Sequence, residues 1–221
     1  MSNWFSSDFH GYHKNICRGT SEWDKGPPKV VSGIHGIQST RDFKTVEEMN
    51  EAILKGINDH VKWDDVLYFL GDFTFGGQDK MWRFRRRINC ENIHFIFGNH
   101  DKAIEHNVVM VDDDNKYVCA DDLFLTRGYY KHISLGKQEI IMSHYAFRVW
   151  NRSHHGSIML YGHSHDSLDR GGEEWGKSMD VGIDSAFRRF GEYRPFSEDE
   201  ILKIMATRPI NIVDHHNQHT N

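Results

Sequence analysis

The stretch Gly98-Asn99-His100-Asp101 places an amide, an imidazole and a carboxylate directly behind the apolar run Ile93-His94-Phe95-Ile96-Phe97. The apolar run predicts a buried strand, and a glycine directly after it allows the chain to turn sharply. Because open α/β sheets keep their sites at the carboxyl ends of their strands, we expect chemistry at this turn. Gly-Asn is also ordinary turn composition, so the rest of the chain decides between a site and a plain turn.

Four other apolar segments are followed by residues of the same kinds. The four following stretches are Asp8-Phe9-His10, Gly71-Asp72, Ser143-His144 and Gly162-His163-Ser164-His165. Each segment is short and apolar enough to predict a buried strand. Five strand ends that all carry carboxylate, amide or imidazole groups favour one shared site over five unrelated turns.

The composition narrows the class of protein. With 221 residues the chain is long enough for a substantial core, and we expect one domain over residues 1–221. A net charge of −5 argues against a general nucleic-acid coat and against a binder of anionic membranes, so a small-molecule partner fits better. The three cysteines, Cys17, Cys90 and Cys119, are widely spaced and indicate neither a disulfide framework nor a structural zinc site.

The sequence shows neither a signal-peptide pattern nor an apolar window close to the ~18 residues that a membrane span needs. With the cysteine pattern, this predicts a soluble protein of the reducing cytoplasm that does not bind membranes.

Periodicity and capping residues predict an α/β fold. Helices are expected over residues 12–17, 45–61, 79–88 and 197–205, with a short helix after Asp101. Strands are expected over residues 3–7, 66–70, 93–97, 130–135, 138–142, 158–161 and 178–183, and the hairpin-like pair 130–135 and 138–142 predicts a second sheet.

Two segments are expected to be irregular. Residues 18–44 are rich in glycine, proline and charge, which predicts a long loop or lid that overhangs the site. Residues 208–221 are expected to form a flexible tail.

The residues at the strand ends share the chemistry of metal ligands. The seven candidates are Asp8, His10, Asp72, Asn99, His144, His163 and His165. Seven oxygen and nitrogen donors are enough for two divalent ions with one bridging carboxylate. Such donors suit Mn²⁺, Fe, Zn²⁺ or Ni²⁺, and the absence of cysteine disfavours a soft structural zinc centre.

The five motifs resemble the ordered blocks of the calcineurin-like metallophosphoesterases, over most of the chain. The pattern is similar to the compact bacterial and phage members, in which a loop with a tryptophan, here Trp150, lies between the last two histidine blocks. The resemblance implies a four-layer α/β/β/α sandwich of two mixed sheets with a dinuclear metal site at the strand ends. No tyrosine stands where purple acid phosphatases bind ferric iron, so a ferric chromophore is not expected.

The resemblance also implies how the seven ligands divide between the two ions. One ion would take Asp8, His10, Asp72 and His165, and the other Asp72, Asn99, His144 and His163, with Asp72 bridging. Two ions about 3.5–4 Å apart can hold a bridging hydroxide that attacks the phosphoester. Manganese is the expected metal.

Two further residues are expected to be catalytic. His100 is the candidate acid for the leaving group. Asp101 is expected either to orient the His100 imidazole or to cap the following helix. Arg148 and Arg152 are candidate ligands of the substrate phosphate.

We expect a small phosphomonoester or phosphodiester as substrate, with a nucleotide favoured. Phe147 and Trp150 could stack on a base, although core packing is the simpler expectation. One alternative is a nuclease acting on DNA or RNA, which would need a basic groove from residues 83–87 and 188–189. A solvated helix face is the simpler interpretation of residues 83–87. Another is a catalytically weak, metal-bound interaction scaffold.

Overall fold

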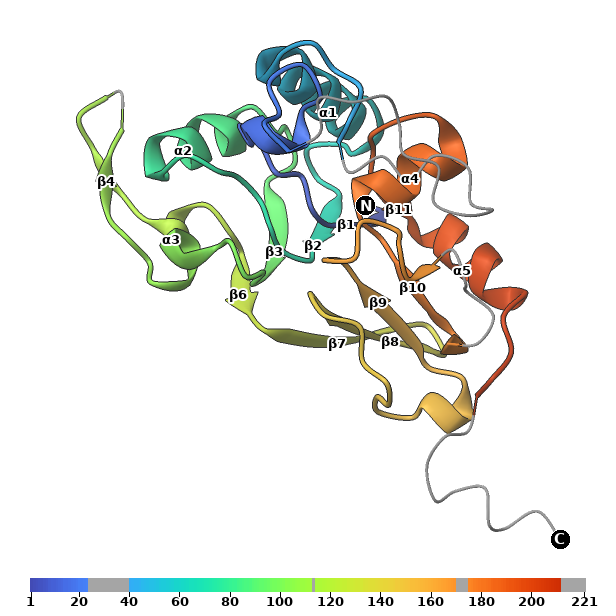
Figure 1. Cartoon of the computed structure of the whole chain (residues 1–221). Helices are drawn as coiled ribbons and strands as arrows, with labels where there is room; N and C mark the ends of the chain where they lie inside the picture. Colours follow the sequence, from blue (N-terminus) through green and yellow to red (C-terminus); the bar gives the residue numbers. More distant parts are fainter. Residues whose placement is uncertain (24–39, 113, 170–174, 212–221) are drawn as a thin grey trace, which may run out of the picture.

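Parallel strand pairing joins segments that lie far apart in the sequence into a first sheet (Figure 1). The computed structural model describes residues 1–23, 40–112, 114–169 and 175–211. In the order β11-β1-β2-β3-β6, the strands of the first sheet are Phe196–Ser197, Asn3–Ser6, Val66–Phe69, Asn92–Ile96 and Thr126–Gly128. The strands β1, β2, β3 and β6 pair in parallel, and β11 pairs with β1 antiparallel, so the sheet is mixed.

A second sheet is also mixed. In the order β10-β9-β8-β7, its strands are Ser178–Asp180, Ile158–Tyr161, Gln138–Ser143 and Tyr130–Leu135. The strands β7 and β8 form the predicted hairpin around Gly136 and Lys137, whereas β8, β9 and β10 run parallel. A small antiparallel pair, β4 (Met110–Val111) with β5 (Tyr117–Val118), is separate from both sheets.

Among the described residues, the helical segments are short except for one. They are η1 (Lys14–Ile16), α1 (Val46–His60), α2 (Gln78–Arg86), α3 (Lys102–Glu105), η2 (Ala120–Asp122), η3 (Ser153–His155), α4 (Ile183–Phe190) and α5 (Glu198–Ala206). The capping boxes expected at Thr45 and Ser197 are both present, with Glu48 and Glu200 as their third helical residues. In the described part of the chain, no helix combines the length and apolarity that crossing a membrane requires.

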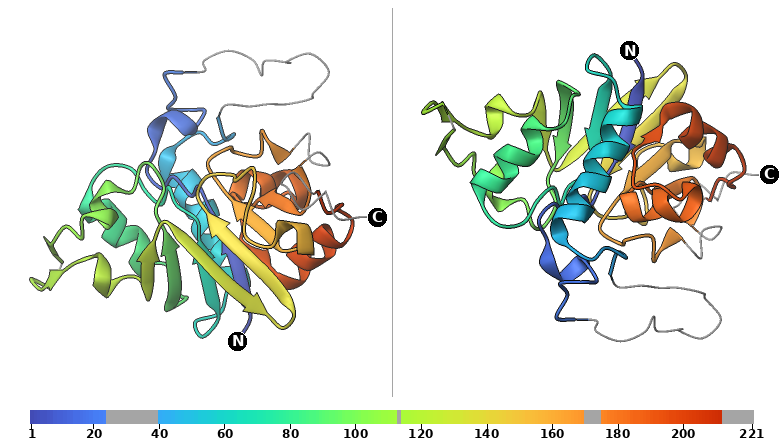
Figure 2. Two further views of the ribbon diagram at one scale, coloured as in Figure 1. Left: turned by 90° about the horizontal axis from the view of Figure 1, so that it is seen from below. Right: turned by 90° about the horizontal axis from the view of Figure 1, so that it is seen from above.

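Alternating side chains give the first sheet two buried faces. Leu67 and Phe69 of β2 pack with Met49, Ile53 and Ile57 of α1 in one hydrophobic cluster. The views in Figure 2 show α1 lying along this sheet, on the side away from β7 and β8. The strand periodicity of two therefore separates a helix-covered face from the opposite face.

The opposite face of the first sheet packs against the second sheet. Phe5 and Tyr68 from the first sheet share a buried cluster with Ile140, Met142 and Leu160 from the second. On the other side of the second sheet, a small cluster of strand residues is covered by side chains from the loop before β9. A mixed α/β fold with two mixed sheets is thus confirmed, while the four-layer sandwich and the single domain stay predictions.

Two local expectations are corrected. The strand expected over 178–183 ends at Asp180, because Gly182 is the N-cap of α4, a helix the alternating apolar residues did not indicate. The helix expected over 12–17 is a single 3-10 turn. Of the expected loop or lid at 18–44, residues 24–39 lie outside the described residues, and so do residues 212–221 of the expected tail.

Candidate metal centre

Most of the predicted metal ligands share an unusual backbone conformation. Left-handed φ values between 45° and 65° occur at Asp8, His10, Asp72, His163 and His165. Residues other than glycine rarely adopt this region, and it persists only where the surroundings impose it. Such strain clusters at functional sites, so its presence at five of the seven candidates points to a function in ligand placement.

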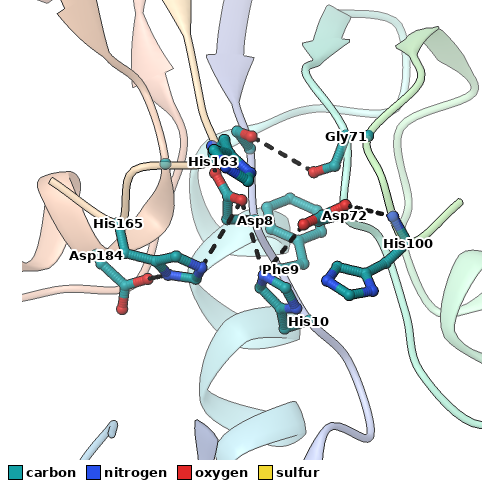
Figure 3. Close-up of polar contacts among 12 residues, drawn as sticks. Asp8, Phe9, His10, Gly71, Asp72, His100, His163, His165 and Asp184 are labelled. Carbon is teal, nitrogen blue, oxygen red and sulfur yellow. Dashed lines mark hydrogen bonds and ion pairs between the residues drawn. The ribbon is translucent and has the colours of Figure 1, made fainter. Parts of the chain in front are cut away.

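The turns that follow β1 and β2 run side by side and are joined by backbone hydrogen bonds. The Asp8 N–H donates to the Gly71 carbonyl at 2.9 Å, and the His10 N–H donates to the Asp72 carbonyl at 3.0 Å. Figure 3 shows Gly71 and Asp72 beside Asp8 and His10. The close approach of neighbouring turns also requires glycine at position 162, where a Cβ would lie 1.9 Å from Ser7 Oγ.

Each of the two central carboxylates uses one oxygen for the backbone and leaves the other facing the imidazoles. Asp8 Oδ2 accepts the His163 N–H at 2.9 Å, and Asp72 Oδ1 accepts the His100 N–H at 3.0 Å. Asp8 Oδ1 has no hydrogen-bond partner in the described structure and lies 3.7 Å from His10 Nε2. The backbone thus fixes both carboxylates, and one oxygen of each faces imidazole nitrogens.

Six of the seven predicted ligands form two groups that could each hold a metal ion. The first metal-ligand group is Asp8, His10 and His165, and the second metal-ligand group is Asp72, His144 and His163. Asp72 Oδ2 lies 3.6 Å from His10 Nε2 and 3.6 Å from His144 Nε2, so one carboxylate oxygen faces both groups. Two donors each about 2.1 Å from one ion lie roughly 3.0–3.4 Å apart, close to these separations.

The amide of Asn99 lies beside the second metal-ligand group. Its Oδ1 lies 3.1 Å from His144 Nε2 and accepts a hydrogen bond from the Tyr145 hydroxyl at 3.4 Å. On the other side of the ring, His144 Nδ1 lies 2.7 Å from the Leu70 carbonyl. A carbonyl only accepts, so Nδ1 carries the proton and the Nε2 lone pair faces Asp72 and Asn99.

His10 is a buried imidazole with both ring nitrogens unpartnered. It is 3% exposed, and neither Nδ1 nor Nε2 has a hydrogen-bond partner among the described residues. Burial lowers the pKa of His10 to about 3, so the ring is neutral and keeps a free lone pair. Buried polar atoms without partners are costly, and a metal ion bound to Nε2, the nitrogen that faces Asp8 and Asp72, would satisfy one of the two.

The carboxylates also fit a cation. Burial by itself would raise the pKa of Asp8, but the neighbouring His10 and His165 imidazoles hold it below its usual value. Burial and the Asp8 charge together raise the pKa of Asp72. Two buried carboxylates that disturb each other in this way would be stabilised by positive charge between them.

Arg41 and Asp184 surround the first metal-ligand group and were not identified from the sequence. Asp184 Oδ2 lies 2.7 Å from His165 Nδ1 and accepts a hydrogen bond from Arg41 Nη2 at 2.9 Å. Burial alone would lower the pKa of His165, but the hydrogen bond to Asp184 raises it to about 9. Asp184 follows a strand and a glycine, as Asp72 does, and that signal could have found it; the loop position of Arg41 carries no such signal.

His100 lies beside the first metal-ligand group with an exposed side chain. Its ring centroid is 5.9 Å from that of His10 and 4.6 Å from that of Phe75. A pocket of about 140 Å³ adjoins the ring and is lined mainly by Thr74, Phe75, Met81, His100 and Ile104. The His100 ring therefore borders both the first metal-ligand group and this pocket.

The structure corrects the role expected for Asp101. Its carboxylate accepts the N–H groups of Asp72 at 2.7 Å, Phe73 at 2.9 Å and Gly98 at 2.8 Å. With both oxygens engaged in this way, it makes no side-chain cap for α3, and no hydrogen bond joins it to His100 in the described structure. Asp101 holds the turns after β2 and β3 together instead of orienting the imidazole.

The loop between His144 and β9 carries two aromatic side chains and two arginines for which the sequence raised expectations. Phe147 and Trp150 pack on the second sheet, and Trp150 Nε1 donates to the Ser157 carbonyl, which confirms core packing. Arg152 directly precedes η3, at the start of β9, whereas the ligands follow the end of that strand. It is therefore not brought to the metal-ligand groups, while the exposed Arg148 stays a candidate phosphate ligand.

Comparison of the sequence with known proteins finds a relative whose name assigns it no function. No family model matches the chain. It is 33% identical over 102 residues to "Uncharacterized protein MJ1445" of Methanocaldococcus jannaschii, a match that covers 41% of this chain and spans 57% of that protein's length.

Two solved structures resemble the chain. "Protein of Unknown Function AQ665" from Aquifex aeolicus matches with a TM-score of 0.59 at 22% identity, over 92% of this chain and 98% of that one, which shows a shared fold. "Yfce, a phosphoesterase from E. coli" matches with a TM-score of 0.37 at 15% identity, over 83% and 79% of the two chains.

Proposed function

We propose that this protein is a phosphoesterase of the calcineurin-like class that uses two divalent ions to hydrolyse a small phosphomonoester or phosphodiester. The observation that carries the proposal is the position of Asp72 Oδ2, 3.6 Å from an imidazole nitrogen of each metal-ligand group. The donors are all nitrogen and oxygen, a set that suits Mn²⁺, Fe, Zn²⁺ or Ni²⁺, and Mn²⁺ is the metal that we propose.

The residues present fit two such ions. His10 and Asp8 Oδ1 offer buried lone pairs that no described protein group uses, and the His144 lone pair is aimed by the Leu70 carbonyl. When bound, the ions would supply Lewis-acid activation of water and stabilise charge on the phosphoryl group.

His100 is the proposed acid for the leaving group. Its side chain is exposed, and its ring lies between His10 and the pocket beside Phe75. From that position the imidazole can donate a proton to the departing oxygen of an ester whose alcohol part enters the pocket. Arg148, four residues after His144, is the proposed contact to the outer phosphate oxygens.

The size of the pocket supports a compact ester, with a nucleotide or sugar phosphate as the favoured class. At about 140 Å³ it is smaller than the roughly 300–1,000 Å³ of most ligand pockets, so it would hold one small group.

The nuclease alternative receives less support from the arginines. Arg85 donates to the Leu123 carbonyl and Arg87 pairs with Glu51, while Arg188 pairs with Asp166 and Arg189 with Asp169. These cations are engaged with the protein itself and do not form a free basic groove.

The test is turnover of a panel of nucleotides, cyclic nucleotides and sugar phosphates by protein reconstituted with Mn²⁺. We expect hydrolysis that chelation abolishes and that His144→Ala removes. The matched control is His132→Ala, which removes a β7 imidazole that pairs with Glu139 and lies outside both metal-ligand groups. This variant should keep full turnover. Tight binding of two ions without hydrolysis of any ester would instead support the scaffold alternative.

A second experiment tests the acid. His100→Asn should lose on the order of 10²–10⁴-fold in kcat on an alkyl ester and much less on an activated aryl ester, whose leaving group needs no proton. An equal loss on both esters with the metal retained would assign His100 to the phosphoryl group.

A further inference from the structure

We propose that the ion pair between the buried Arg41 and the partly exposed Asp184 positions the whole first metal-ligand group and sets the metal affinity of that group alone. The inference rests on the proposed metal centre and assigns a positioning function to two residues outside it. Its basis is the set of contacts that this one pair makes to Asp8, the Phe9 carbonyl and His165.

Arg41 holds the backbone that presents two of the ligands. Its Nη2 donates to the Asp8 carbonyl at 2.6 Å, and its Nη1 donates to the Phe9 carbonyl at 2.7 Å. These carbonyls lie between Asp8 and His10, which both have left-handed φ values of 58° and 50°. A strained turn of this kind needs outside contacts to persist, and the guanidinium supplies them.

Asp184 holds the third ligand. Its carboxylate takes Arg41 Nε and Nη2 at 2.9 Å each and also binds His165 Nδ1 at 2.7 Å. Because the carboxylate accepts the Nδ1 proton, Nε2 is the His165 nitrogen that points toward Asp8, 4.0 Å away, and is left for a metal ion. Figure 3 shows the His165 ring between Asp184 and Asp8. Asp184 also balances the Arg41 charge, which would otherwise repel a cation in the first metal-ligand group.

Arg41 is itself anchored in the fold and not available to substrate. It is 3% exposed, its N–H donates to the Ile16 carbonyl at 2.6 Å, and its carbonyl accepts the Arg18 N–H at 2.9 Å. The pair therefore acts through the ligands and does not touch the reacting atoms. It also ties the chain shortly before α1 to the ligand-bearing turn after β1.

The contacts that hold the second metal-ligand group come from elsewhere. His144 is oriented by the Leu70 carbonyl, and Asp72 is held by the His100 N–H. In the described structure, the Arg41 and Asp184 side chains hydrogen-bond to none of Asp72, His144 and His163. Loss of the pair should consequently weaken one site and spare the other.

The experiment isolates each site before removing the pair. In the full chain carrying His144→Ala, the remaining Mn²⁺ site is the first metal-ligand group, and in His10→Ala it is the second. Calorimetric titration with Mn²⁺ should show that Asp184→Asn weakens binding about 10–100-fold in the His144→Ala background, the usual effect of removing an outer partner of a ligating histidine. In the His10→Ala background the same change should alter the dissociation constant by less than about threefold.

A matched control separates positioning from general loss of stability. Arg194 and Glu200 form a comparable pair, with Nη2–Oε1 and Nη1–Oε2 at 2.7 and 3.0 Å and Arg194 7% exposed, outside both metal-ligand groups. Glu200→Gln should leave Mn²⁺ binding unchanged in both backgrounds. If Asp184→Asn prevents folding, as seen by circular dichroism, Arg41→Lys decides, because lysine keeps the charge but cannot reach both carbonyls and Asp184 together.

The outcomes are distinct. Equal weakening in both backgrounds, no weakening in either, or equal effects of Asp184→Asn and Glu200→Gln would overturn the inference while leaving the metal centre intact. Absence of any Mn²⁺ binding by the wild-type chain would instead overturn the proposed function on which the inference rests.

Discussion

Replacing Gly98 with alanine tests whether close packing of the ligand-bearing turns sets the position of Asp72. The added Cβ would lie 2.3 Å from Asp72 Oδ1 and 2.6 Å from Asp72 N, whereas ordinary contacts begin at 3.4 Å. Gly98 itself does not have a left-handed φ, so the substitution changes the available space and not the permitted backbone. Either the Asp72 carboxylate or the turn after β3 must therefore move by about 1 Å.

That movement affects both metal-ligand groups. Asp72 Oδ1 accepts the His100 N–H, and Oδ2 lies 3.6 Å from nitrogens of His10 and His144. A misplacement of about 1 Å can cost on the order of 10²-fold in rate, and overpacking costs about 1–3 kcal/mol of stability. We expect losses of this size in kcat and in the free energy of unfolding for Gly98→Ala, with fewer than two Mn²⁺ per chain.

The assay compares Gly98→Ala with Gly128→Ala on β6 of the same sheet. A Cβ at Gly128 would meet only Tyr130 O, at 3.9 Å, so this variant should keep wild-type metal content and turnover. Metal analysis, steady-state kinetics on an aryl phosphate and denaturant unfolding give the three readouts. Two bound ions and wild-type kcat in Gly98→Ala would refute the steric reasoning.

Three further outcomes are expected. In metal-free protein, the hydrogen bond to Asp184 raises the pKa of His165 to about 9. The stabilisation from this ion pair is therefore complete below pH 6.5 and is lost as the pH rises through about 9. The free energy of unfolding, measured from pH 6 to 10, should fall accordingly, and Asp184→Asn should abolish this pH dependence. Arg148→Ala should raise KM for a phosphomonoester several-fold and Arg152→Ala should not, and equal effects in steady-state kinetics would contradict the assignment. Replacing Cys17, Cys90 and Cys119 with serine should leave the bound metal unchanged but lower the unfolding midpoint, because Cys17 and Cys90 are buried.

The local sequence pattern was sufficient to predict elements whose formation depends mainly on their own residues. The capping boxes at Thr45 and Ser197 and the long helix α1 follow from short-range signals, and the structure confirms them. The second sheet followed from the hairpin around Gly136 for the same reason. By contrast, α4 was missed because its first residues continue the apolar alternation of β10, and only the packing around Gly182 ends the strand.

The candidate metal ligands could be recognised from local sequence, since six of the seven candidates meet in two groups and Asn99 lies beside one of them. Strand ends can be found from local apolar runs, and parallel strands bring their carboxyl ends to one edge of a sheet. The groups that hold those ligands in place could not be recognised in this way, because they depend on long-range packing. Asp101 accepts three backbone N–H groups, and Arg41 pairs with Asp184, 143 residues away. Both arrangements depend on where turns from different strands approach each other, and no local pattern in the sequence specifies that approach.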